Sequence, residues 1–559
     1  MKIRSHIPTV VSRFAFIAGL ADILANVLYP LKIRKHELET YLPIFVNSAA
    51  FATAVISGFG LIVLARNLRR RKKRAWIFTV ILLSINIFSD LFRLHYHPGQ
   101  VAGAALLLIL LIVYRNEFYA QSDPSTRMKP LYAFGFAFFV MFLSGLLILL
   151  NRHRDAFLGS PSVWQLTQTV LLGFVGIPGP VNFVTERMSD IVTTTLSILG
   201  VFTVIVPFMY LFKRVSPIAK QSPEEREVIK DLIRIDTEQD SLGYFATRAD
   251  KSVVWAKNRK AGIAYRVQNG VMLASGDPFG EFSLWPDAIQ EFLAIARSHA
   301  WTPAVMGASD RGGEVWVKKA EMLAVDIGDE AVIHVKDFTL EGKPMGNVRN
   351  MINKVSKKGY SAKSQKWNEL DLETKAELKA LTKKWRYGAE ERGFSMSMDR
   401  FGDDSDSESV ITIARCDGKI LGLQYFVPWS SHSLSLDRMQ RDRDAEAGVN
   451  ELMIAATVEY ARSQDMKYVS LNFAAFRSLF ERADKISAGP VTRGMRNLIR
   501  LFSNYFQVES LFRFNAKFYP EWQTRYVLYP KARDLPSVAW AAIKAEQFIK
   551  GFGKRRTSV

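Results

Sequence analysis

The fold class is decided by residues 409–428, which read SVITIARCDGKILGLQYFVP. Two runs rich in β-branched and aromatic residues, at 409–415 and 422–428, predict two strands. The elements predicted around them are a helix at 373–385, a helix at 450–463 and a strand at 468–472. Strands that alternate with helices in this way are typical of an α/β fold.

The same order of elements occurs earlier in the chain. The β-type runs there lie at 243–247, 252–255, 262–267 and 270–275, followed by a helix at 287–299 and a strand at 303–307. A repeated order of this kind predicts two similar α/β modules packed together, as in tandem acetyltransferase-like (GNAT-like) folds.

The residues before these modules are strongly apolar. Apolar stretches that approach the roughly 20 residues needed to cross a membrane lie at 12–29, 44–65, 76–92, 101–114, 131–150 and 191–212. The Arg/Lys-rich loop at 66–74 indicates the cytoplasmic side, and counting spans from it places the chain after Lys213-Arg214 in the cytoplasm. A shorter apolar segment at 163–177 is expected to be re-entrant or interfacial. We therefore predict a polytopic α-helical membrane domain in the inner (plasma) membrane, with a cytoplasmic C-terminal part.

These patterns divide the chain into five segments. We predict a transmembrane domain of about six helices at 1–214, a linker helix within 215–240, a first module at 241–345, a second module carrying the active site at 346–535, and a C-terminal helix with a basic tail at 536–559. The linker helix is expected to begin at Ser222-Pro223, because a serine N-cap, a proline at the first position and a returning Glu225 form a helix-start signal.

Charge and missing motifs narrow the classes of function. The chain has 74 Lys and Arg against 54 Asp and Glu, so a polyanionic partner such as nucleic acid or anionic lipid is expected. The single cysteine, Cys416, excludes an intramolecular disulfide framework and a cysteine-based zinc site. Neither a phosphate-binding P-loop nor a dinucleotide glycine motif is present. The helix expected to cradle coenzyme A opens at 447–451 with one glycine and the acidic Glu451, which suits a cationic ligand better than a pyrophosphate, so we expect no cofactor.

A basic segment stands between the two modules. Its cationic residues are Arg349, Lys354, Lys357 and Lys358. On a helix they form a broad stripe suited to nucleic-acid phosphates, although a charge run alone favours a solvated helix face.

Several motifs then resemble one family. They are SLFRFNAKFYPEW at 510–522 followed by Arg525-Tyr526, GDP at 276–278, ERGF at 391–394, LDRM at 436–439, NELM at 450–453 and LNF at 471–473. In this order they resemble aminoacyl-phosphatidylglycerol synthases of the multiple peptide resistance factor type. The resemblance covers about 241–530 and is nearest to the actinobacterial branch, in which some members fuse a lysyl-tRNA synthetase behind the transferase. We expect no synthetase in this chain.

The resemblance implies a transfer reaction at the inner leaflet. An amino acid moves from aminoacyl-tRNA to a hydroxyl of phosphatidylglycerol, which lowers the negative charge of the membrane and promotes resistance to cationic antimicrobial peptides. Because the aminoacyl ester is already activated, the enzyme must position its substrates, remove a proton and stabilise an oxyanion, without a metal or a covalent nucleophile.

Residues within these motifs are candidates for each task. The predicted catalytic residues are Asp437, Glu451, Arg441 and Asn472, and the predicted substrate-binding residues are Arg513, Lys517 and Arg525. The carboxylates suit the ammonium group and proton removal, the cations suit phosphates or the oxyanion, and Asn472 suits the reacting carbonyl.

The resemblance also implies that the basic stripe at 349–358 binds tRNA. Asn472 has the alternative role of capping a strand end. The family commonly has arginine where this chain has Gln440, which leaves the amino acid open.

Two other functions stay open on the sequence alone. One keeps the tRNA donor and changes the acceptor, for example to diacylglycerol. The other is a lipid flippase or transporter whose soluble half binds lipid and regulates. The expected partners are aminoacyl-tRNA, phosphatidylglycerol and the membrane, and a homo-oligomer is among the open options.

Overall fold

The computed structural model describes residues 2–28, 57–91, 98–120, 129–151, 156–211, 221–235, 240–386, 393–473 and 508–546. The chain divides into two compact units, one mainly of Met1–Pro217 and one of Ile218–Arg297 with Trp301–Val559. Within the predictions above, the first part of the span at 44–65, the first half of the ERGF motif and the basic tail lie outside the described residues.

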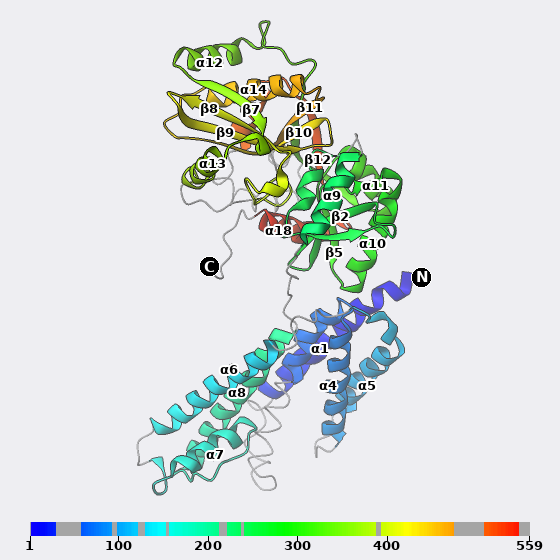
Figure 1. Ribbon diagram of the computed structural model, residues 1–559. Coiled ribbons are helices and arrows are strands. Elements are labelled where there is room, and N and C mark those ends of the chain that lie inside the picture. Colours follow the sequence, from blue (N-terminus) through cyan, green and yellow to red (C-terminus); the bar gives the residue numbers. More distant parts are fainter. Residues whose placement is uncertain are drawn as a thin grey trace. The chain divides into compact units, whose positions relative to one another are not determined.

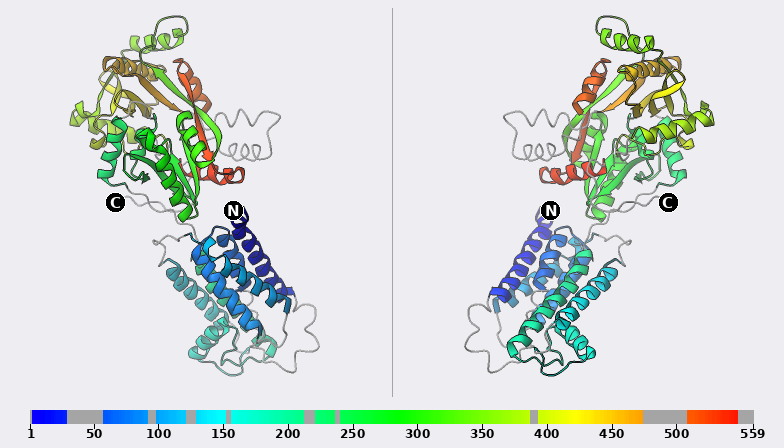
Figure 2. Two further views of the ribbon diagram at one scale, coloured as in Figure 1. Left: turned by 90° about the vertical axis from the view of Figure 1, so that its right-hand side faces the viewer. Right: turned by 90° about the vertical axis from the view of Figure 1, so that its left-hand side faces the viewer.

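The N-terminal unit is a helical bundle in its described residues (Figures 1 and 2). Its helices include α1 (Lys2–Leu28), α4 (Lys73–Leu91), α5 (Pro98–Val113), α6 (Lys129–Leu150), α7 (Val163–Phe174) and α8 (Glu186–Leu211). Two segments, Leu131–Leu150 and Glu186–Ile205, are long and apolar enough to cross a membrane. Shorter apolar helices lie at Ile7–Ala21, Ser57–Leu68 and Val101–Val113. Two of the described helices are therefore long and apolar enough to cross a membrane, and the count of six spans stays a prediction.

The C-terminal unit is built on one twelve-stranded sheet with the order β1-β2-β3-β5-β12-β6-β11-β10-β9-β8-β7, and β4 pairs with β2. The strands are β1 (Ser252–Trp255), β2 (Ala261–Gln268), β3 (Val271–Ser275), β4 (Phe279–Gly280), β5 (Thr302–Ala308), β6 (Leu323–His334), β7 (Ser361–Lys366), β8 (Val410–Cys416), β9 (Lys419–Pro428), β10 (Ser433–Arg441), β11 (Tyr468–Phe473) and β12 (Glu521–Tyr529). The helices are α9 (Pro223–Ile235), α10 (Trp285–Ser298), α11 (Asp310–Ala320), α12 (Gly346–Lys357), α13 (Leu372–Lys384), α14 (Val449–Ser463), α17 (Val508–Ala516) and α18 (Leu535–Ala545).

The two halves of this sheet repeat one topology, which confirms the prediction of two similar α/β modules. In the first half, β1, β2 and β3 are antiparallel, and β3 then pairs in parallel with β5 across the helix α10. In the second half, β7 to β10 are antiparallel, and β10 pairs in parallel with β11 across α14.

The halves exchange a strand at the centre of the sheet. The strand β6 follows the first half in the chain, but it pairs with β11 of the second half. The strand β12 follows the second half and pairs with β5 of the first, and β12 and β6 pair with each other. Each half therefore depends on a strand from the other, so the sheet forms one continuous body.

Helices cover both faces of the sheet. The strand β9 shows the alternation, because Leu423 and Tyr425 pack in the core beneath α13, whereas Phe426 packs in the core beneath α14. Figure 1 shows α13 and α14 on opposite sides of these strands. The helix α18 joins the α13 core, and a separate core holds Trp285 and Trp316 of α10 and α11.

Local predictions were mostly confirmed. The linker helix α9 begins at Pro223, and the Glu225 amide donates a hydrogen bond to Ser222 Oγ at 3.1 Å. The prediction of a strand at 243–247 is wrong, since Gly243–Thr247 forms a 3₁₀ helix whose five residues are all buried. Its apolar run reflects burial on every side and not the two-residue period of a strand.

Candidate functional site

The candidate site lies where the parallel strands β10 and β11 separate. Their pairing ends at Ser435 and Ser470, and the pairing of β10 with β9 shifts its register between Leu436 and Arg438. Asp437 therefore sits at an irregularity of the strand, at the point where its pairing with β11 has ended.

One oxygen of Asp437 is bound and the other is not. The Met398 amide donates to Oδ1 at 2.7 Å, whereas Oδ2 is buried and has no hydrogen-bond partner among the described residues. Asp437 as a whole is only half-buried, so its buried part is the carboxyl group. Burial raises the pKa of Asp437 to about 7, against the opposing effects of the Met398 hydrogen bond and of Arg248. A carboxyl group with this pKa can take up a proton at neutral pH, as a general base must.

Asn472 fixes the strand beside Asp437. It lies near the end of β11 with a φ of 66°, a left-handed conformation that asparagine adopts more readily than most residues. Its Nδ2 donates to the Leu436 carbonyl oxygen at 2.9 Å, and its main-chain amide donates to Ser470 Oγ at 3.0 Å. The side chain thus ties together the two strands that diverge at Asp437, which agrees with the alternative role as a strand-end cap.

Two other predicted residues, Glu451 and Lys517, come together. Glu451 lies buried in the first turn of α14, and Lys517 follows α17. Lys517 Nζ lies 2.8 Å from Glu451 Oε1. The charge of Glu451 is therefore neutralised within the protein, so a substrate ammonium group would have to share or displace Lys517.

The predicted cations differ in their surroundings. Arg441 ends β10 and donates to the Ala445 carbonyl oxygen, and Arg513 is exposed on α17. Arg525 is fully buried, with Nη1 at 2.6 Å from Asp240 Oδ1 and with a second ion pair to Glu330. We correct the prediction for Arg525: it joins β12 to β6 inside the protein and does not present its guanidinium group to a phosphate.

Arg438, which lies next to Asp437, was not predicted from the sequence. Its guanidinium carbon is 5.2 Å from the centre of the Phe401 ring. Burial and the charge of Arg386 lower the pKa of Arg438 to about 10. Its place in the LDRM motif was the available signal.

The predicted tRNA-binding residues lie on and just after α12, and three of the four have partners nearby. Arg349 donates to the Leu340 carbonyl oxygen at 2.6 Å. Lys354 Nζ is 3.9 Å from Glu446 Oε2, and Lys358 binds the same carboxylate. Lys357 lies in the last turn of the helix. The stripe is therefore partly neutralised, and its role in tRNA binding stays a prediction.

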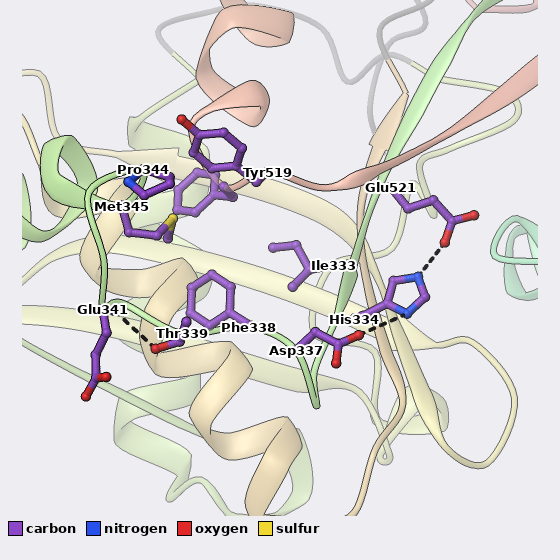
Figure 3. Close-up of a pocket in the computed structure, with 11 residues that line it drawn as sticks. Ile333, His334, Asp337, Phe338, Thr339, Glu341, Pro344, Met345, Tyr519 and Glu521 are labelled. Carbon is purple, nitrogen blue, oxygen red and sulfur yellow. Dashed lines mark hydrogen bonds and ion pairs between the residues drawn. The ribbon is translucent and has the colours of Figure 1, made fainter.

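A cavity of about 500 Å³ is lined mostly by residues between Ile333 and Met345, together with residues 518–521, and none of the predicted residues lines it (Figure 3). His334 stands on its wall between Asp337 and Glu521, and Phe338 and Phe518 supply apolar surface. His334 pairs with Tyr468 at the start of β11, whereas Asp437 lies beyond the other end of the β10–β11 pairing. Among the described residues, no group of three or more His, Cys, Asp or Glu side chains could hold a metal ion.

Comparison with known proteins gives matches that include the C-terminal unit and its candidate site. The family described as "Phosphatidylglycerol lysyltransferase, C-terminal" matches residues 230–529. The chain is 32% identical over 552 residues to the lysylphosphatidylglycerol biosynthesis bifunctional protein LysX of Mycolicibacterium gilvum, covering 97% of this chain and 49% of that protein. It is 34% identical over 547 residues to the LysX protein of Rhodococcus jostii, covering 96% of this chain and 48% of that protein.

The fold is also shared with a solved structure, that of L-PGS from Bacillus licheniformis. The TM-score is 0.51 at 18% identity, and the match covers 60% of this chain and 98% of that one. At this identity the likeness concerns the fold alone. The chain spans about half the length of the curated relatives that it matches.

Proposed function

We propose, from the premise that this chain belongs to the family of phosphatidylglycerol lysyltransferase C-terminal domains, that it transfers lysine from lysyl-tRNA to a hydroxyl of phosphatidylglycerol. The names of the LysX relatives support lysine as the amino acid. The product would carry a net charge of about +1 where phosphatidylglycerol carries −1, so it would weaken the attraction of the membrane for cationic peptides.

The observation that carries this proposal is the free oxygen of Asp437. A glycerol hydroxyl that approaches Oδ2 finds a buried acceptor without a competing partner among the described residues. In the reaction, the hydroxyl oxygen attacks the ester carbonyl while Oδ2 takes its proton, and a tetrahedral intermediate forms. The intermediate collapses when the ester bond to the tRNA ribose breaks, and the ribose oxygen takes the proton back from Asp437.

The neighbouring groups would divide the remaining tasks. Glu451 would contact the α-ammonium group of the lysyl ester, in exchange with Lys517. Arg438 and Arg441 follow Asp437 along β10, and their charges would stabilise the oxyanion or a phosphate at the mouth of the site. Because an aminoacyl ester is already reactive, positioning and proton transfer suffice without a cofactor.

The N-terminal unit would hold the enzyme at its lipid substrate. We propose that all six apolar stretches span the inner membrane and that the C-terminal unit faces the cytoplasm, where charged tRNA is found. The two long apolar helices and the Arg/Lys-rich loop at 66–74 support this topology. The five segments predicted from the sequence, with the active site in the second module and a tRNA surface on α12, are part of the same proposal.

A reconstituted assay tests the reaction. The full chain is placed in phosphatidylglycerol vesicles with radiolabelled lysyl-tRNA, and lipid-extractable label is counted. We expect label in the lipid phase with lysyl-tRNA, and much less with alanyl-tRNA or with vesicles of phosphatidylethanolamine. Label that enters diacylglycerol in mixed vesicles, and not phosphatidylglycerol, would replace the proposed acceptor.

A further inference from the structure

The segment at 393–400 carries the amide that binds Asp437, and parts of the chain far away in sequence hold it. Met398 in this segment is the only donor to Asp437 among the described hydrogen bonds. The segment has no helix or strand of its own. Its conformation must therefore come from its contacts.

One end of the segment is held by Glu546, the residue that follows α18. Oε2 of Glu546 accepts a hydrogen bond from the Phe394 amide at 2.7 Å. Oε1 accepts one from the Ser395 amide at 3.0 Å and another from the Ser395 hydroxyl. Glu546 is 2% exposed, so a buried carboxylate uses both oxygens on two consecutive residues of one segment. A buried charge is costly unless donors surround it, and here the segment supplies them.

The helix α18, which directly precedes Glu546 in the chain, packs in a hydrophobic core with strands of the first module. Val538 and Ala542 of α18 lie in the same cluster as Leu273 of β3 and Met306 of β5. Arg266 of β2 donates to the Ala545 carbonyl oxygen at 3.2 Å. Glu546 thus reaches the second module from a fixed position on the first.

Arginines hold the other end of the segment. Arg248, which follows the first-module helix at Gly243–Thr247, is 1% exposed and donates to the Ser397 carbonyl oxygen at 2.6 Å. Arg400 reaches back to the Thr247 carbonyl oxygen at 2.7 Å and to its hydroxyl at 2.8 Å. Met398 therefore lies between two anchored residues.

From these contacts we propose that Glu546 is a positioning residue for the transfer reaction: it holds residues 394–395 so that the Met398 amide stays on Asp437 Oδ1 and Oδ2 stays directed to the substrate. This assignment rests on the proposed function. It also gives the first module and the C-terminal helix a role in a site to which they contribute no reacting group.

The proposal predicts a change in the pH dependence of transfer. The charged or titratable groups that act on Asp437 are Arg248, Arg400, Asp406 and Tyr425. The Met398 hydrogen bond stabilises the ionised form of Asp437, so its loss raises the pKa of the base. A general base with a higher pKa reaches its active form at a higher pH.

The test compares Glu546→Gln with the wild type in the full chain. A glutamine keeps the size of the side chain but turns an NH₂ group toward one of the two main-chain amides, so the segment must shift. We expect the acid limb of the kcat profile to move up by about one pH unit, kcat at pH 7 to fall about fivefold because less of the base is ionised there, and KM to change little. Glu521→Gln is the matched control, because it makes the same chemical change at the cavity wall, away from Asp437.

A profile for Glu546→Gln equal to that of the wild type overturns the proposal. If Glu546→Gln does not fold, Ser395→Ala decides, since it removes only the hydroxyl contact: a smaller shift in the same direction supports the proposal, and an unchanged profile rejects it. Wild-type activity in the same assay separates this outcome from a failure of the proposed function, because an inactive wild type rejects the function itself.

Discussion

Lys517 Nζ lies 2.8 Å from Glu451 Oε1 and so joins the segment after α17 to the first turn of α14. The contact neutralises an almost fully buried carboxylate. It also brings together two residues that are separated by 66 positions and that the sequence motifs select independently.

Removal of Lys517 tests this pair. In Lys517→Met, Glu451 keeps its buried charge without its partner, so we expect the protein to lose about 1–3 kcal/mol of stability. In the double variant with Glu451→Gln, no charge is left unpaired and most of the stability is recovered. Urea unfolding of the full chain in detergent measures the free energy of unfolding of the single and the double variant. Equal destabilisation of the single and double variants would contradict the pairing.

Asp437→Asn separates proton transfer from structure. Asparagine keeps the size of the side chain but cannot take the hydroxyl proton, so we expect transfer to fall about 10²–10⁴-fold with an unchanged fold. Initial rates of lysyl transfer to vesicles check this, with circular dichroism as the control for folding. Activity within about threefold of the wild type would remove Asp437 from the reaction, because general-base catalysis contributes far more than that.

The same variant makes a prediction about stability and pH. The pKa of Asp437 is about 7 in the folded protein against an ordinary value of 3.8, so the folded protein binds more protons between these values. Stability from this group is full below about pH 4 and is lost as the pH rises toward 7. We expect the thermal midpoint of Asp437→Asn to rise relative to that of the wild type from about pH 5 to about pH 8. A difference that does not depend on pH would contradict the raised pKa.

The variant Arg525→Met tests whether Arg525 has a structural or a substrate-binding role. In Arg525→Met, Asp240 and Glu330 are left as buried carboxylates without this partner, so we expect the protein to be destabilised by about 3–5 kcal/mol. Thermal unfolding checks this. A variant that folds normally and shows only a raised KM would restore the original prediction that Arg525 binds substrate.

The salt dependence of tRNA binding tests the stripe at α12. Replacement of Lys357 and Lys358 by glutamine removes two charges, and the slope of log K against log salt should fall by just under one for each phosphate that is no longer neutralised. Filter binding of tRNA across a salt series measures the slope. An unchanged slope would assign α12 to a solvated face.

Much of this fold could be predicted because its signals are local. The runs around β8 and β9, the helix α14 and the repeated order of elements are all visible in the sequence. The exchange of β6 and β12 was not predicted, because pairing between strands nearly 200 residues apart leaves no trace in one sequence.

The residues of the site likewise divide into those with a local signal in the sequence and those held by long-range contacts. Asp437 could be found because it stands in the LDRM motif, although it lies at an irregularity within β10 and not at the end of the strand. Glu546 could not be found, because its contacts with Phe394 and Ser395 span about 150 positions and the segment that it holds has no periodic pattern. Arg525 lies next to a motif, but a sequence does not show that an arginine is fully buried between two carboxylates.

Lipid mass spectrometry tests whether this chain aminoacylates phosphatidylglycerol through Asp437. Cells that express the full chain are compared with cells that express Asp437→Asn at the same level. We predict a phosphatidylglycerol species heavier by one lysyl group with the wild-type chain, and none with the variant. An unchanged lipid profile in both, with well-expressed and folded protein, would contradict the transfer reaction and favour a role in lipid transport.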